Sequence, residues 1–121
     1  MKVKHYQAQS HEDIDGEDGV YTGTTITLFH HYIYPDSREK LEIQCQEGRN
    51  KYTYILSKVS PEKFSGTLKD SPESRLDLTR LVMPDGRIRF QGPFSNEGES
   101  SGTWYIDIVK TEEFNSDEVS A

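Results

Sequence analysis

Three segments of the chain alternate between apolar and polar residues. Their apolar positions are Leu41, Ile43 and Cys45, then Ile88, Phe90 and Phe94, and then Trp104, Ile106 and Ile108. A two-residue period is typical of a strand with one buried and one solvated face, because successive strand side chains point to opposite sides. We therefore predict three strands in which these residues are buried and the residues between or beside them, such as Glu42, Arg87, Arg89 and Asp107, are exposed.

Further strands are predicted where β-branched, aromatic and aliphatic residues cluster with less regular alternation. These runs are 20–34, 51–59, 64–69 and 75–83, with 3–8 as an additional candidate, which makes about eight strands. Short turn sequences such as Pro84-Asp85-Gly86 separate them, and connections this short pair neighbouring strands antiparallel. The pattern predicts an all-β fold: one domain over 1–121, built as a single antiparallel up-and-down β-barrel of short strands.

A glycine step recurs within the predicted strands. Thr22-Gly23-Thr24, Ser65-Gly66-Thr67 and Ser101-Gly102-Thr103 share it. Glycine inside a strand usually marks a bend or a close approach of two backbones, and barrel corners use such glycines. The repeat favours a curved, closed sheet; the alternative is coincidence in a chain rich in serine, threonine and glycine.

The last of these steps continues into Trp104. Gly102-Thr103-Trp104 resembles the Gly-x-Trp signature that lipocalins and related calycin barrels carry on their first strand, whereas here it lies on the last predicted strand. The likeness covers three residues. It implies a lipocalin/calycin-like architecture, with a tryptophan closing one end of the barrel, and not membership of the family.

The net charge of −7 is concentrated at the two ends of the chain. Residues 20–110 contain twelve basic and twelve acidic side chains, whereas 1–19 sum to −3 and 111–121 to −4. A balanced body lacks the basic face that a nucleic-acid-binding protein needs, so no nucleic-acid partner is expected. The acidic ends, 1–19 in part and 111–121, are predicted to be flexible and to keep the protein soluble.

The cellular compartment follows from what the sequence lacks. A single cysteine, Cys45, excludes an intramolecular disulfide and a cysteine-based zinc site, and is predicted to be a chemically quiet core residue. The N-terminus has no apolar region typical of a signal peptide, and no stretch reaches membrane-spanning length. We expect a cytoplasmic protein with no membrane partner, although a chain whose signal had been removed would look the same.

His30 and His31 are the first candidates for chemistry. As neighbours in a strand they point to opposite faces and cannot chelate one ion together. If Ile26, Leu28 and Tyr32 face the interior, His30 does too and His31 faces water. The expected role of His30 is that of a buried histidine satisfied by a neighbouring hydroxyl; a metal ligand or general base is the alternative.

No metal site, cofactor or catalytic residue is predicted. The acidic run 13–19 lacks the glycine and the glutamate that an EF-hand needs at its sixth and twelfth positions, which favours a solvated linker. The chain also lacks a nucleophile elbow, a phosphate-binding glycine loop and a zinc-binding helix motif. An enzyme that uses His30 at the barrel mouth is therefore the third of three functional interpretations.

Aromatic residues motivate the leading interpretation. Seven tyrosines, five phenylalanines and one tryptophan are many for so polar a chain. An eight-stranded barrel is either filled by side chains or holds one small ligand, and both alternatives stay open. In the second case the protein is a non-enzymatic binding module for a small apolar or aromatic ligand. The predicted ligand-binding residues are Ile26, Leu28, His30, Tyr32, Tyr54, Phe90 and Trp104.

The runner-up is a protein-interaction or assembly module. It would use an exposed strand edge or an outer aromatic patch formed by residues such as Tyr105, Phe29 or Tyr21. A homo-oligomer is compatible with either interpretation.

Overall fold

The computed structural model describes residues 1–17, 19–23, 25–96 and 101–116, and the side chains of 21–23 lie outside the description. Nine strands and no helix occur in these ranges. The strands are β1 (Lys2–Ile14), β2 (Tyr21–Gly23), β3 (Ile26–Ile33), β4 (Glu39–Glu47), β5 (Asn50–Ser60), β6 (Lys63–Leu68), β7 (Ser71–Val82), β8 (Ile88–Ser95) and β9 (Ser101–Asn115).

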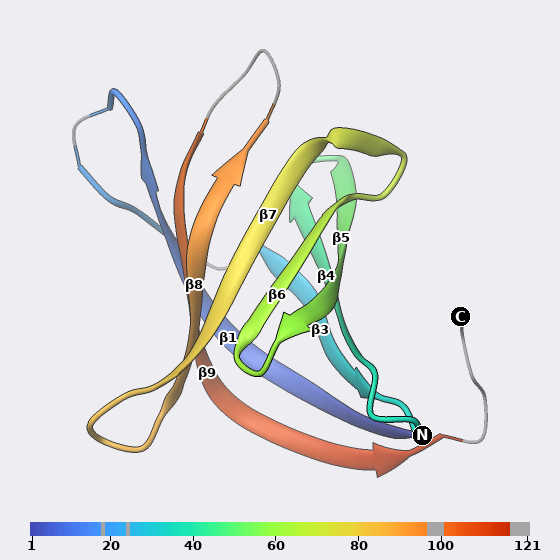
Figure 1. Ribbon diagram of the computed structural model, residues 1–121. Coiled ribbons are helices and arrows are strands. Elements are labelled where there is room, and N and C mark those ends of the chain that lie inside the picture. The colour runs from blue at the N-terminus through green and yellow to red at the C-terminus, as the bar shows by residue number, and fades with distance from the viewer. Residues whose placement is uncertain (18, 24, 97–100, 117–121) are drawn as a thin grey trace.

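The strands form one closed antiparallel barrel (Figure 1). From β3 to β9 each strand pairs with the next, and β1 closes the barrel by pairing with both β3 and β9. β2 and β3 follow one another along the same edge of β1, so the predicted strand over 20–34 is divided in two. The predicted all-β, up-and-down barrel is confirmed, with eight strands in the closed ring and β2 as an addition beside β1.

The prediction that both chain ends are flexible needs a correction. Residues 2–14 are the strand β1, and its ladder with β9 runs from Lys2↔Asn115 to Ile14↔Gly102. Residues 111–115 therefore belong to the barrel wall and are not a free tail. The charges hid this, because Glu112 and Glu113 point to opposite faces of β9 and are both exposed, so this part of the strand has no buried face that an alternating pattern would reveal. Residues 117–121 lie outside the described part of the chain.

The two ends of the barrel differ. The hairpin loops at 15–17, 48–49 and 69–70 gather at one end, here called the open end, and the N-terminus lies at the other, the closed end (Figure 1). Two turns at the closed end, 34–38 and 83–87, share the sequence Pro-Asp-Ser/Gly-Arg. In each, the aspartate accepts hydrogen bonds from the arginine two residues later, which holds the pKa of Asp36 and of Asp85 below the usual range.

The core fills the barrel between the open end and the turns. Eight of the nine residues predicted to be buried are so: Leu41, Ile43, Cys45, Phe90, Phe94, Trp104, Ile106 and Ile108. Ile88 is half-buried against the core. Arg87 is exposed as predicted, whereas Glu42, Arg89 and Asp107 are half-buried on the outer face, where Arg89 Nε donates to Asp107 Oδ1 at 2.7 Å.

The predicted register of β3 is wrong over most of its length. The β3–β4 ladder shifts between Ile26 and Leu28, so that Thr27 is an extra residue. A β-bulge of this kind reverses the alternation beyond it. Ile26 still packs against the core, but Phe29 and His31 take the following inward positions and are 0% and 4% exposed.

The residues expected inside after the bulge are therefore on the outer face. His30 Nδ1 lies 3.1 Å from the Tyr32 hydroxyl, which donates to Glu42 Oε1 at 3.0 Å. Leu28, also on this face, is half-buried.

Candidate functional site

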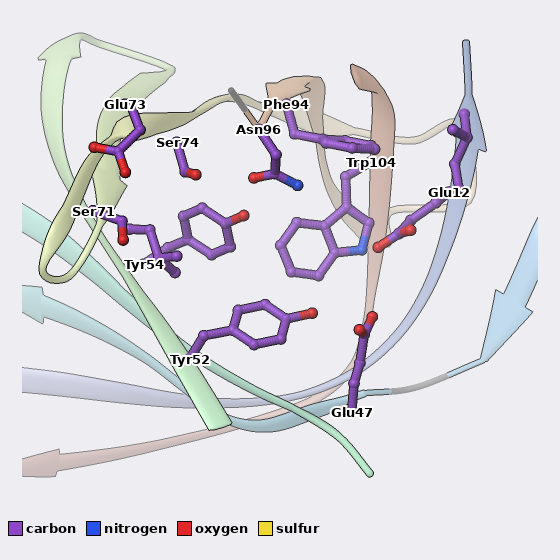
Figure 2. Close-up of a pocket in the computed structure, with 12 residues that line it drawn as sticks. Glu12, Glu47, Tyr52, Tyr54, Ser71, Glu73, Ser74, Phe94, Asn96 and Trp104 are labelled. Atoms are coloured by element: carbon purple, nitrogen blue, oxygen red, sulfur yellow. The ribbon is translucent and has the colours of Figure 1, made fainter. Parts of the chain in front are cut away.

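A pocket of about 410 Å³ lies at the open end of the barrel. Its lining combines aromatic rings, carboxylates and smaller groups from seven strands and the residue that follows β8 (Figure 2). The aromatic members are Tyr52, Tyr54, Phe94 and Trp104; the carboxylates are Glu12, Glu47 and Glu73; the others are Ile14, Leu68, Ser71, Ser74 and Asn96. This volume is within the range of small-molecule sites.

Strand geometry explains why these side chains meet. Tyr52 and Tyr54 are two residues apart on β5 and so share the inner face. Trp104 has Glu12 directly opposite it in β1 and Gly92 directly opposite it in β8. Cross-strand partners point to the same side of a sheet, so Glu12 faces the indole.

Three rings surround one space at the centre of the pocket (Figure 2). The Tyr52 and Tyr54 ring centroids are 6.1 Å apart with an interplanar angle of 85°, and those of Tyr54 and Trp104 are 6.1 Å apart at 57°. The rings therefore stand at large angles to one another and are not stacked. Part of each apolar surface faces the pocket.

Trp104 brings an unsatisfied donor to this space. Its side chain is 4% exposed, and its Nε1–H has no acceptor among the described residues. Figure 2 shows the indole nitrogen on the side of the pocket that Glu12 and Glu47 occupy. A buried donor without an acceptor costs roughly 1–3 kcal/mol, and native folds retain few of them.

The electrostatics of the pocket are dominated by carboxylates. Burial, and then the nearby Glu47 carboxylate, raise the pKa of Glu12 above its ordinary value. Burial, the Cys45 thiol and Glu47 likewise raise the pKa of Tyr52. No lysine or arginine is among the described lining residues, and none of the described ion pairs involves Glu12.

We expect Glu12→Gln to stabilise the fold at neutral pH. A carboxyl whose pKa is raised by folding binds its proton more tightly in the folded state, so ionisation reduces stability as the pH rises through the folded pKa. At pH 7 the melting temperature of the variant should exceed that of the parent by up to a few degrees, because solvent screens part of the effect. Below the unfolded pKa of glutamate the two melting temperatures should be equal. A variant less stable than the parent at pH 7 would contradict an uncompensated Glu12 charge.

Only two of the seven predicted ligand-binding residues line this pocket, Tyr54 and Trp104. Phe90 is fully buried deeper in the barrel, and Ile26 packs against the core. Leu28, His30 and Tyr32 were displaced to the outer face by the bulge at Thr27. The carboxylates of the lining were not predicted as site residues, because charged side chains are normally solvated, although Glu12 shares the alternation of Ser10 and Ile14 on β1.

The closed end contains a buried histidine, which is His31 and not His30. His31 Nε2 lies 2.7 Å from Glu39 Oε1, and its Nδ1 lies 2.9 Å from the Tyr6 hydroxyl. Because a carboxylate only accepts, Nε2 carries the proton and Nδ1 accepts from Tyr6. Burial lowers the pKa of His31 and raises that of Tyr6 to about 12, so a neutral imidazole and a neutral phenol pair here, beside the Glu39 carboxylate that also accepts from Lys58.

Metal chemistry finds no support in the described residues. They contain no group of three or more histidine, cysteine or acidic side chains placed to hold a metal ion. Burial raises the pKa of the Cys45 thiol to about 12, which keeps it protonated.

No helix in the described ranges is long and apolar enough to cross a membrane. Comparisons with protein-family models, with curated proteins and with solved structures give no match to this chain.

Proposed function

We propose that this protein is a non-enzymatic binding module that holds one small molecule with an apolar or aromatic body in the pocket at the open end. The observation that carries the proposal is the buried, unpartnered Nε1–H of Trp104 beside the rings of Tyr52 and Tyr54. Such a site combines apolar walls with a few polar groups that orient a ligand. Burial of apolar surface would supply roughly 25 cal/mol per Å².

The division of the barrel supports this role. Interlocking rings fill the closed half, where the centroids of Phe29 and Phe90 are 5.3 Å apart. The open half instead contains the pocket of about 410 Å³. A packed base beneath a hollow mouth keeps the pocket walls in place without ligand, which reduces the entropy lost on binding.

The interaction-module alternative has less support. Phe29, one of its three expected outer aromatics, is fully buried, and the side chain of Tyr21 lies outside the described residues. Tyr105 is half-buried and stacks on His11 at 4.6 Å. A homo-oligomer and a cytoplasmic location stay predictions from the sequence.

A neutral fluorescent probe tests the proposal. N-phenyl-1-naphthylamine, titrated into the protein, should gain fluorescence along a saturable one-site curve. Ser74 is buried in the pocket wall, so Ser74→Leu should weaken this binding at least about tenfold by filling the space, a change of about 1.4 kcal/mol.

The matched control is Ser95→Leu, an exposed position on β8 beside the pocket residue Phe94. It should leave the affinity unchanged. A titration that does not saturate, or equal affinity in folded Ser74→Leu and parent protein, would overturn the proposed function.

A further inference from the structure

The carboxylates of the pocket specify the charge of its ligand. We infer that the pocket binds a small organic ammonium ion that also carries an uncharged hydrogen-bond acceptor, such as a hydroxyl group. This inference rests on the proposed function and names its ligand class.

The charge of the lining favours a cation. Glu12, Glu47 and Glu73 bring three carboxylates to one pocket, with no basic residue among its described lining. Glu12 is half-buried, and a charge taken out of water is costly unless it is paired. A cationic ligand would supply the missing partner, whereas an anionic ligand would be repelled.

The arrangement of the rings also favours a cation. Tyr52, Tyr54 and Trp104 stand at large angles around one space (Figure 2). The negative face of an aromatic ring attracts a cation, tryptophan most strongly, and several rings at angles form the cage that recognises alkylated ammonium groups. A metal ion would need clustered ligand atoms, and the described residues contain no such cluster.

The indole nitrogen of Trp104 indicates a second group on the ligand. Trp104 is 4% exposed and its Nε1–H lacks an acceptor among the described residues. An acceptor that is itself anionic would lie against Glu12 and Glu47, so the complementary group is uncharged. A hydroxyl can accept from Trp104 Nε1–H and donate to a neighbouring carboxylate at the same time.

Choline and its uncharged isostere 3,3-dimethyl-1-butanol test the charge requirement. The two have the same shape and the same hydroxyl group, but choline has a quaternary nitrogen where the alcohol has a quaternary carbon. By isothermal titration calorimetry choline should bind at least about tenfold more tightly, the ratio expected for desolvated cation–π contacts. Trp104 is the only tryptophan of the chain, so a shift of its fluorescence with choline would place the ligand in this pocket.

Two variants assign the interactions. Glu12→Gln should weaken choline several-fold and leave the alcohol unchanged, while Glu112→Gln, exposed on β9 far along the ladder from Glu12, should change neither. Trp104→Phe retains a ring but no donor. The parent protein should bind choline more tightly than tetramethylammonium, which has no hydroxyl, and the variant should lose this difference in affinity.

The outcomes separate the two proposals. The ammonium inference is overturned if choline and 3,3-dimethyl-1-butanol bind with equal affinity, or if Glu12→Gln does not weaken choline binding. In either case, saturable binding of N-phenyl-1-naphthylamine would still support the binding module. If Trp104→Phe prefers choline to tetramethylammonium as strongly as the parent does, the role of the indole donor is overturned. If none of these small molecules binds, both proposals fall.

Discussion

Gly92→Ala should destabilise the barrel by more than about 4 kcal/mol, a loss that ordinary surface substitutions do not reach. A Cβ placed at Gly92 would lie 1.8 Å from the carbonyl oxygen of Asp77 on the neighbouring strand β7. The obstructing atom belongs to the backbone, so no side-chain rotation relieves the overlap. β7 and β8 would have to separate, which breaks the ladder that joins them, and urea unfolding would measure the loss.

A second glycine provides the control. Gly48, in the turn between β4 and β5, has φ of +59°, and nothing lies within 4 Å of its added Cβ. Gly48→Ala therefore meets only the strain of a left-handed conformation, about 1 kcal/mol. If Gly92→Ala were no more destabilising than Gly48→Ala, the close approach of β7 and β8 would not exist in solution.

These glycines show what composition and pattern reveal about curvature. The recurring Ser-Gly-Thr step predicted bends at Gly66 and Gly102, and an added Cβ there would lie 1.9 Å from the oxygen of Ile55 and 2.1 Å from that of Asp13. Both glycines therefore lie at a close approach of two backbones, one of the two features that the step was taken to mark in favour of a curved sheet. Gly92 has the same role without the repeated step, so the physical requirement is wider than the sequence signal.

Local pattern was less informative about register. The alternation on β4 and β9 predicted their buried faces correctly, because both strands are regular there. On β3 one extra residue, Thr27, reversed every later position, although Ile26 and Leu28 look like a continuing alternation. Thr27 Oγ1 donates to the backbone oxygen of Gln44 at 3.3 Å, a contact with another strand that no local pattern contains.

The candidate site was only partly predictable for a related reason. Trp104 and Tyr54 are large aromatics in alternating runs, and the sequence placed them inside. Glu12 and Glu47 carry charges that normally mark a wet face, so pattern reasoning assigned them to solvent. Glu12 is half-buried and Glu47 is exposed, but both line one mouth because of where β1 and β4 end, which is a property of the closed barrel.

The second large effect is expected deeper in the barrel, at Phe90. This ring is 0% exposed, and its centroid lies 5.3 Å from that of Phe29 and 6.0 Å from that of Phe64. Phe90→Ala leaves a cavity in the packed half of the barrel that the surrounding side chains cannot fill. The substitution should lower the free energy of unfolding by about 3–5 kcal/mol. The matched control is Phe114→Ala on β9, whose side chain is 47% exposed, with an expected loss below about 1 kcal/mol.

Phe90→Ala also tests the division of the barrel into a packed half and a hollow half. Phe90 is not among the residues that line the pocket at the open end. Under conditions in which the variant is still folded, its affinity for N-phenyl-1-naphthylamine should match that of the parent, although its urea midpoint is much lower. Parallel loss of binding and stability would mean that the packed half and the pocket are one continuous cavity wall. Loss of stability alone would mean that the closed half supports the fold while the open half is free to specify a ligand.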